Sequence, residues 1–160
     1  MLTDRVIIIT GASSGIGAAT AIEAARQGMD VVITARREDR LKDVAARVRA
    51  LGRRCEIVAG DVTESGMPDR LLDAAERAFG RFDFVYPNAG YGVAHPMIDV
   101  SPPEMRDMFE VNFFAGVELL QKAAQRLIAQ NRPGHLLMCS CCLARFTLAL
   151  NAIYCATKAA

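Results

Sequence analysis

The chain has 160 residues, of which 52% are hydrophobic and 23% are charged, and its 19 lysines and arginines against 18 acidic residues give a formal net charge of +1. This composition is typical of one globular domain with its own core, without the strongly basic surface of a nucleic-acid or acidic-membrane binder. No apolar run approaches the ~20 residues that cross a bilayer, and the first ten residues lack the features of a signal peptide, so we expect a cytoplasmic protein without a membrane partner.

Apolar runs and amphipathic stretches alternate regularly along the chain. The first run, RVIIIT (5–10), is rich in β-branched residues and predicts a strand buried on both faces, and GIGAATAIEAARQG (15–28) predicts a helix. The same reasoning predicts strands at 31–35, 55–62 (with a turn), 82–90 (entering a loop) and 135–140, helices at 38–52, 67–80, 101–131 and from 153 onward, and a loop at 143–152. This order predicts right-handed βαβ units and a doubly wound, Rossmann-like α/β fold with about five parallel strands, in one domain over residues 1–160.

The long helix predicted over residues 101–131 carries its own start and stop signals. Ser101 is a favourable N-cap, Pro102 suits the first helical position, and Glu104 completes a capping box. Pro133 and Gly134 end the helix before the next apolar run.

The segment TGASSGIG (10–17) lies between the first predicted strand and the first predicted helix. Gly11 permits a tight turn, Gly15 lets the backbone approach a phosphate, and Gly17 lets the helix pack close to the strand. Unpaired N–H groups at the helix start then favour a pyrophosphate, with Ser13, Ser14 and Ile16 in the same loop. No Lys-Ser or Lys-Thr follows, which excludes a Walker-type loop. A glycine-rich turn without a ligand is the alternative.

The second predicted strand ends in VVITARRED, and this ending bears on the choice of cofactor. Proteins that select NAD usually place a carboxylate here to hold the ribose 2′-hydroxyl, whereas this chain has Ala35, Arg36 and Arg37. Two guanidinium groups suit a 2′-phosphate, so the sequence predicts NADP(H) in preference to NAD(H). A pair of solvated arginines that cap the strand is the alternative.

Five cysteines are present, three of them in MCSCC at 138–142. An odd number without an export signal argues against a disulfide framework. Neighbouring residues of an extended chain point to opposite faces, and no distant pair of cysteines or histidines supplies further ligands. We therefore expect no metal site, and reduced thiols packed around the end of a strand.

Five motifs, in order and at compatible spacings, resemble the short-chain dehydrogenase/reductase family. They are TGASSGIG, Asp61-Val62, Asn88-Ala89-Gly90, Asn112 and the Tyr154–Lys158 segment YCATK. The resemblance implies a doubly wound sheet, with Asp61 and Val62 near the adenine and with Asn88, Ala89 and Gly90 beside the cofactor. It also implies a small-molecule partner, a carbonyl or alcohol that is small or lipophilic, and self-association through the helix over 112–131.

The implied reaction passes a hydride between nicotinamide and a carbonyl or alcohol carbon. Tyr154 would donate or remove the hydroxyl proton, and Lys158 would hold the nicotinamide ribose. An ammonium at ~5 Å, with an effective dielectric constant of ~20, would lower the pKa of the phenol by about two units. Asn112 would bind a water that links Lys158 to solvent. Each residue also has a structural interpretation: a tyrosine at an interface, a surface lysine and an asparagine bonded to backbone.

A serine that binds the substrate oxygen commonly stands thirteen residues before the tyrosine in this family. Counting back from Tyr154 without a gap reaches Cys141, and Ser140 occupies the preceding position. Either the loop is one residue longer and Ser140 serves, or a thiol, which is a weaker donor, replaces the hydroxyl. Pro87 stands where a second asparagine often precedes Asn88.

The family pattern normally continues beyond the tyrosine helix with further strands and a substrate-covering segment. The resemblance therefore implies that residues 1–160 are a domain incomplete at its C-terminus, with the fifth strand left as an apolar edge. An oxidoreductase remains the leading hypothesis. A nucleotide-binding module without turnover, or an inactive shortened family member, is the alternative.

Overall fold

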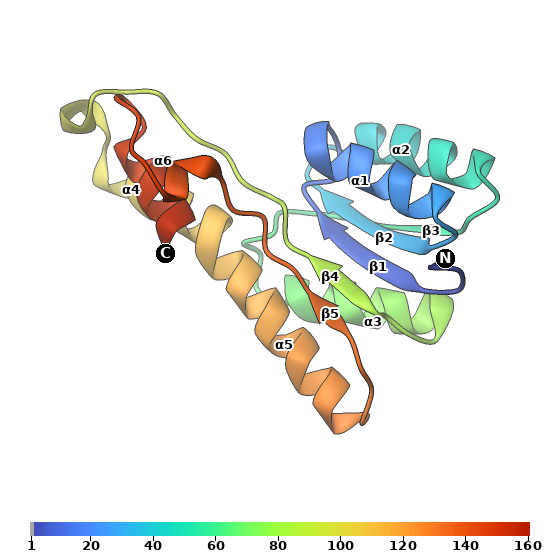
Figure 1. Cartoon of the computed structure of the whole chain (residues 1–160). Helices are drawn as coiled ribbons and strands as arrows, with labels where there is room; N and C mark the ends of the chain where they lie inside the picture. Colours follow the sequence, from blue (N-terminus) through green and yellow to red (C-terminus); the bar gives the residue numbers. More distant parts are fainter. Residues whose placement is uncertain (1) are drawn as a thin grey trace.

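Five parallel strands form one sheet in the computed structural model, which describes residues 2–160; Met1, the first residue of the predicted domain, lies outside them. The strands are β1 (Val6–Thr10), β2 (Asp30–Ala35), β3 (Cys55–Ala59), β4 (Phe84–Tyr86) and β5 (His135–Leu136), and their order across the sheet is β3-β2-β1-β4-β5 (Figure 1). The predicted doubly wound, Rossmann-like fold is confirmed. The strand order reverses beside β1, between β1 and β4, where such folds place their ligands.

Helices cover both faces of the sheet, as Figure 1 shows. Helices α1 (Gly15–Arg26) and α2 (Glu38–Ala50) lie on one face, and α3 (Met67–Phe79) and α5 (Ala115–Ala129) lie on the other. β1 separates two hydrophobic clusters because its side chains alternate: Ile7 and Ile9 face α1 and α2, while Val6 and Ile8 face α3 and α5. Both clusters are closed to solvent, which explains the nearly continuous apolar run of this strand.

The helix predicted over residues 101–131 is divided into three parts. Helix α4 (Pro102–Phe109) is followed by a π-helical turn, η2 (Glu110–Phe114), before α5 begins. Ser101 caps α4, since its hydroxyl oxygen accepts a hydrogen bond from the Glu104 N–H at 3.3 Å. The predicted cap is therefore present, but the prediction of one uninterrupted α-helix is wrong.

The predicted strand over 135–140 is shorter than expected, because only His135 and Leu136 form regular ladder pairs with β4. The chain nevertheless continues alongside β4, since the N–H of Leu137 donates to Val85 O at 3.0 Å and that of Cys139 to Pro87 O at 3.1 Å. β5 lies at the edge of the sheet, and Leu136, Leu137 and Met138 are 37–46% exposed. This confirms the predicted apolar edge.

The last part of the chain lies beyond the carboxyl ends of the strands. After β5 come a short 3₁₀ turn, η3 (Cys142–Ala144), and helix α6 (Ala152–Ala159), which packs against α4 (Figure 1). Another 3₁₀ turn, η1 (Met97–Asp99), precedes α4. Within the described residues, none of the helices is both long enough and apolar enough to span a bilayer.

Candidate active site

The glycine-rich loop joins the end of β1 to the start of α1. Gly11 and Gly15 have φ angles of 66° and 55°, in the left-handed region that glycine adopts at little cost. A Cβ atom added to Gly17 would come within 2.5 Å of Gly11 O and 2.7 Å of the Asn88 amide nitrogen. The loop therefore needs glycine at Gly11 and Gly15 for conformation and at Gly17 for close packing.

Thr10, the last residue of β1, fixes the loop that follows β4. Its hydroxyl oxygen accepts hydrogen bonds from the N–H groups of Asn88 and Ala89, both at 3.0 Å, and its carbonyl oxygen accepts one from the Asn88 side-chain amide at 3.1 Å. Sequence reasoning missed this role of Thr10. A threonine at the end of a buried strand, directly before the glycine-rich loop, was the available signal.

The two arginines after β2 lie in different surroundings. One nitrogen of the Arg37 guanidinium donates to the hydroxyl oxygens of Ser13 and Ser14, at 2.9 and 2.8 Å. The side chain of Arg36 is 79% exposed, and its guanidinium lies 3.7 Å from a carboxylate oxygen of Asp61. Arg37 therefore already touches the glycine-rich loop, whereas Arg36 has a single long ion pair.

These residues surround a cleft of about 220 Å³ at the carboxyl ends of β1, β2 and β3. The cleft is lined by Gly11, Ser13, Ser14, Ala35, Arg36, Arg37, Gly60, Asp61, Val62, Ala89, Gly90, Tyr91 and Val111. Nine of the fifteen predicted cofactor residues are in this lining, whereas Gly15, Ile16, Gly17, Asn88, Tyr154 and Lys158 are not. Gly60, Tyr91 and Val111 were not predicted. The donors, positive charge and glycine backbone of the cleft fit a phosphorylated dinucleotide.

Asn112 is held in place by the π-helical turn and is only 2% exposed. Its side-chain oxygen accepts from the Tyr91 N–H at 2.9 Å, and its side-chain nitrogen donates to Tyr91 O at 2.8 Å and to the Thr157 hydroxyl at 3.0 Å. The amide thus ties the segment after β4 to α6. Both side-chain donor hydrogens are used by these contacts, so a water bound to Asn112 would have to donate to one of its oxygen atoms.

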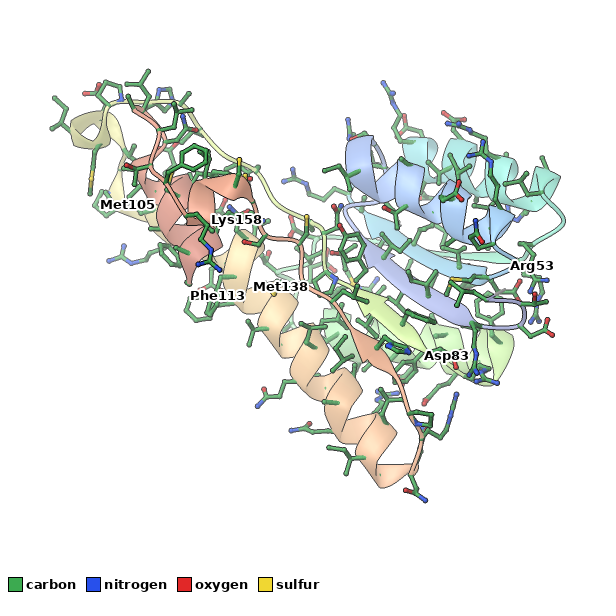
Figure 2. All side chains as sticks on the ribbon, in the orientation of Figure 1. Arg53, Asp83, Met105, Phe113, Met138 and Lys158 are labelled. Carbon is green, nitrogen blue, oxygen red and sulfur yellow. The ribbon has the colours of Figure 1, made fainter. Side chains whose placement is uncertain are left out.

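Tyr154 and Lys158 project from one face of α6, as their four-residue spacing predicts. The Lys158 ammonium donates to Cys139 O at 3.0 Å and lies 5.8 Å from the centroid of the Tyr154 ring. Figure 2 shows Lys158 far from Arg53 and Asp83, which lie toward the amino ends of the strands. Gly92 gives the ring room, because an added Cβ would come within 2.8 Å of Tyr154 Cδ2.

Ser140 and Cys141, the two candidates for the serine role, differ in their contacts. The Ser140 hydroxyl donates to Lys158 O at 3.0 Å. The thiol of Cys141 instead lies beside the Tyr154 hydroxyl, and each influences the pKa of the other. Of the two candidates, Cys141 is therefore the one whose side chain interacts with Tyr154.

The expected lowering of the Tyr154 pKa by Lys158 is absent, and the expectation is wrong for this structure. Burial raises the pKa of Tyr154 above its ordinary value, and the neighbouring Cys141 raises it further because a thiolate disfavours the phenolate. The pKa of Cys141 is lowered, first by a hydrogen bond from the Leu143 N–H and also by Cys142, Tyr154 and the charge of Lys158. The local charge therefore favours a thiolate and a neutral phenol.

The cleft and the Tyr154 region meet at Gly90. A Cβ atom added to Gly90 would lie 3.0 Å from the side-chain oxygen of Asn112 and 3.3 Å from the Lys158 nitrogen. Gly90 also lines the cleft between the glycine-rich loop and the arginines. Gly90 therefore lies between the cleft and the part of the structure that holds Asn112 and Lys158.

Comparison with known proteins identifies the family of this chain. The family model described as short chain dehydrogenase matches residues 5–160, and the chain belongs to that family. It is 36% identical over 159 residues to 1-deoxy-11-beta-hydroxypentalenate dehydrogenase of Streptomyces exfoliatus, a match that covers 98% of this chain and 58% of that protein. The chain spans between 38% and 60% of the length of the first three curated relatives that it matches.

Solved structures with the same fold have been crystallised with either dinucleotide. A metagenomic short-chain oxidoreductase in complex with NADP is 34% identical, with a TM-score of 0.90 over 98% of this chain and 71% of that chain. NAD⁺-bound xylitol dehydrogenase is 26% identical, with a TM-score of 0.92 over 99% of this chain and 61% of that chain. These relatives support a nicotinamide cofactor and an oxidoreductase, and they give the non-catalytic alternative no support.

Proposed function

We propose that residues 1–160 form the dinucleotide-binding domain of an NADP(H)-dependent oxidoreductase that acts on a carbonyl or alcohol carbon. The observation that carries the proposal is the meeting at Gly90 of the phosphate-binding cleft with Asn112 and Lys158. A dinucleotide placed along this cleft would have its phosphates at the glycine-rich loop and its reactive end near Tyr154.

The cleft supplies separate groups for each part of the cofactor. The loop from Gly11 to Gly17 would hold the pyrophosphate on backbone N–H groups, and Asp61 and Val62 would lie along the adenine. Arg36 and Arg37 would hold a 2′-phosphate, which favours NADP(H) over NAD(H). Asn88, Ala89 and Gly90 would support the nicotinamide half, with Lys158 at the ribose. A bound nicotinamide supplies or accepts the hydride, and the protein supplies binding, orientation and proton transfer.

The protein's own chemistry is proton transfer and orientation. Tyr154 is a neutral phenol at neutral pH, since burial and Cys141 raise its pKa, and a neutral phenol can donate a proton to a carbonyl oxygen. Cys141 would place a thiol at the same oxygen, and Lys158 is held near both by its bond to Cys139 O. This arrangement suits carbonyl reduction.

The segment between Cys141 and Tyr154 supports a small or lipophilic substrate. Phe146, Leu148 and Leu150 are each 51–57% exposed there. Their apolar surface would form one wall beside Tyr154. Self-association through the helix over 112–131 stays a prediction.

The test of the proposed cofactor is a fluorescence titration of the protein with NADPH and, separately, with NADH. We expect saturable binding that favours NADPH. Arg37→Gln should weaken NADPH binding about tenfold more than it weakens NADH binding, because only NADPH loses a charge-assisted hydrogen bond to its 2′-phosphate. The matched control is Arg40→Gln on α2, which removes the same charge from a residue outside the cleft lining. Equal affinities for both dinucleotides, or equal losses in both variants, would contradict the assignment of Arg37.

A further inference from the structure

Cys141 and Cys142 bring their sulfur atoms together beside Tyr154. The two Sγ atoms lie 3.9 Å apart, Cys142 is exposed and Cys141 is partly exposed. The expectation that these neighbouring side chains point to opposite faces is wrong for this pair. Cys141 is still extended, with φ −148° and ψ 157°, but the 3₁₀ turn begins at Cys142, and this change of direction turns the second thiol toward the first.

A disulfide bond between Cys141 and Cys142 is unfavourable. Neighbouring Cα atoms are about 3.8 Å apart across a trans peptide bond, whereas disulfides favour about 4.4–6.8 Å. A bond between adjacent cysteines would therefore be strained and easily reduced. A single soft atom bound by both sulfurs avoids this strain. Two thiolates bound at about 2.3 Å to one tetrahedral centre lie about 3.8 Å apart, close to the separation in this protein.

The number of ligands decides which soft atom fits. A zinc site uses four protein ligands, or three with a water. Within residues 2–160, no three histidine, cysteine, aspartate or glutamate side chains gather closely enough to hold a metal ion. A monosubstituted trivalent arsenical needs only two thiolates, because its third bond is to its own organic group. The pair at 141–142 thus supplies the two sulfurs that the arsenical needs, already side by side at 3.9 Å.

We propose that Cys141 and Cys142 form a dithiol site that captures monosubstituted trivalent arsenicals. With phenylarsine oxide, two arsenic–sulfur bonds form and the bonds between arsenic and oxygen break. The oxygen leaves as water together with the two thiol protons, and neither arsenic nor sulfur changes oxidation state. The surroundings favour attack, because the Leu143 N–H and the charge of Lys158 lower the pKa of Cys141 and so raise its thiolate fraction.

Capture would place the arsenical's organic group next to Tyr154. The bound group would block the position where a substrate oxygen meets Tyr154 and so inhibit the enzyme. This expected inhibition rests on the proposed function. The capture itself depends only on the two thiols. It can therefore be tested without cofactor and without turnover.

The experiment is intact-protein mass spectrometry after incubation with phenylarsine oxide and a large excess of glutathione, a monothiol. We expect the protein to keep one phenylarsenic group, and to release it to the dithiol 2,3-dimercaptopropanol. Cys142→Ser leaves a single sulfur at the site and should lower retention on the order of 100-fold, the usual advantage of a second tethered contact. Cys139→Ser is the matched control and should retain the group, with circular dichroism confirming that each variant is folded.

Two outcomes would overturn the proposal. One is loss of the group from the unsubstituted protein in glutathione, and the other is full retention by folded Cys142→Ser, which would place the site on other cysteines. Neither outcome depends on NADPH binding. A failure of the proposed cofactor and a failure of the dithiol site are therefore separate results.

Discussion

At the scale of single residues, burial and, after it, the neighbouring Cys141 raise the pKa of Tyr154. The Lys158 ammonium, which could favour a phenolate, donates its hydrogen bond to Cys139 O and lies 5.8 Å from the Tyr154 ring centroid. Burial and the adjacent thiol instead raise the pKa of Tyr154. A serine at position 141 would stay uncharged at high pH, whereas a cysteine can ionise to a thiolate. The cysteine therefore changes both the hydrogen-bond donor beside Tyr154 and the charge near its hydroxyl.

An alkaline absorbance titration of the tyrosines tests this influence. Burial raises the pKa of Tyr86 and of Tyr91 to about 12. Cys141→Ser removes a negative charge beside Tyr154, and we expect the Tyr154 midpoint to move to lower pH while the other two stay in place. Tyr154→Phe identifies the transition that belongs to this residue. An unchanged midpoint in Cys141→Ser would show that the thiolate does not act on the phenol.

At the scale of secondary-structure elements, the π-helical turn is the feature that assembles the Tyr154 end of the site. It interrupts the helix between α4 and α5, and it directs Asn112 toward Tyr91 on one side and Thr157 on the other. Turns of this kind occur most often at functional sites, where they change the direction of one side chain. Here the result is that α6, which carries Tyr154 and Lys158, is connected to the segment after β4.

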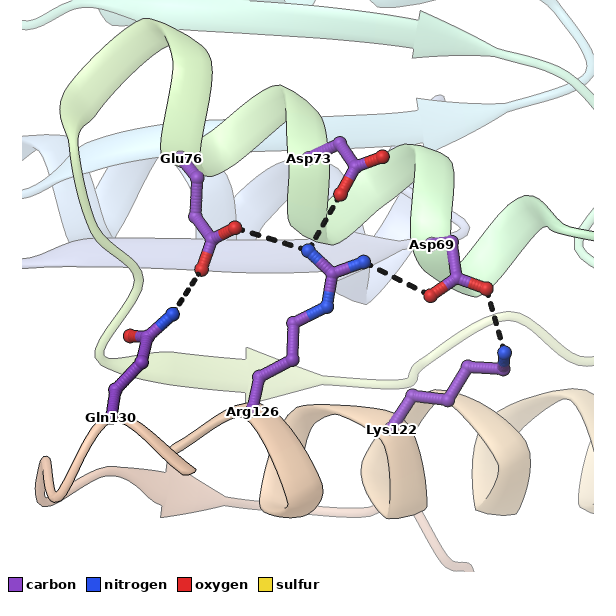
Figure 3. A network of polar contacts seen from close by, with 6 residues as sticks. All are labelled: Asp69, Asp73, Glu76, Lys122, Arg126 and Gln130. Atoms are coloured by element: carbon purple, nitrogen blue, oxygen red, sulfur yellow. Dashed lines mark hydrogen bonds and ion pairs between the residues drawn. The ribbon is translucent and has the colours of Figure 1, made fainter. Parts of the chain in front are cut away.

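Helices α3 and α5 are joined by a network of ion pairs around Arg126 (Figure 3). Its guanidinium donates to Asp69 at 2.9 Å, to Asp73 at 2.6 Å and to Glu76 at 3.0 Å, while Lys122 donates to Asp69 at 2.6 Å. The arginine side chain is 25% exposed, but its partners are 28–51% exposed, so solvent weakens each pair. The network fixes the orientation of α3 relative to α5, while the contact between these helices is stabilised mainly by the apolar cluster that they share.

Replacing the central arginine should have a modest, salt-dependent effect. We expect Arg126→Ala to lower the free energy of unfolding by about 1–2 kcal/mol at low ionic strength, with a smaller loss at high salt because exposed charges are screened. Urea unfolding at two salt concentrations measures this. The matched control is Arg26→Ala, whose partner Glu23 lies on the same exposed helix surface, and it should change stability by less than about 0.5 kcal/mol. A loss that is the same at both salt concentrations would mean that packing, not charge, accounts for the effect.

At the scale of the whole molecule, the two ends of the parallel strands have different roles. The carboxyl ends of the strands hold the candidate site, and the amino ends carry buried carboxylates paired with arginines. Asp83 is 3% exposed and accepts hydrogen bonds from Arg5 at 2.9 Å, from the Val6 N–H at 3.0 Å and from Arg81. It therefore fastens the start of β4 to the start of β1.

Asp83 makes stability depend on pH. Burial alone would raise the pKa of Asp83, but hydrogen bonds from Arg81, Val6 and Arg5 outweigh it and hold the pKa below its usual value. The charged form is thus favoured in the folded state, and its contribution is present above the unfolded pKa of about 3.9 and is lost as the pH falls through the lower, folded value. We expect Asp83→Asn to lower the free energy of unfolding by about 2–3 kcal/mol at pH 7.

Urea unfolding as a function of pH measures this contribution. The difference between the unsubstituted protein and Asp83→Asn should shrink as the pH falls below about 4, because both then carry an uncharged side chain. Asp43→Asn, at an exposed position on α2, is the matched control and should have little effect at any pH. A difference that stays constant down to low pH would assign the effect to shape instead of charge.

Local patterns in the sequence were enough to predict the class of fold and many of the residues that line the cleft at the carboxyl ends of the strands. The β-branched run at β1 and the glycine spacing after it identify a buried strand and a phosphate loop, because burial on two faces and a tight turn each demand particular residue types. Interruptions that depend on distant contacts could not be predicted in this way. The π-helical turn is stabilised by the bonds of Asn112 to Tyr91 and Thr157, 21 and 45 residues away along the chain.

The sequence by itself determined which elements form, the parallel order of the sheet and the family to which the chain belongs, since these follow from residue type and spacing. Only the tertiary structure decided how the groups at the site influence one another. It directs Ser140 to the Lys158 carbonyl and Cys141 to Tyr154, and it brings the sulfurs of Cys141 and Cys142 together. The physical reason is that a pKa, or a contact between side chains, depends on burial and on the position of neighbouring charges in space. These are set when α6 packs against the segment that follows β5.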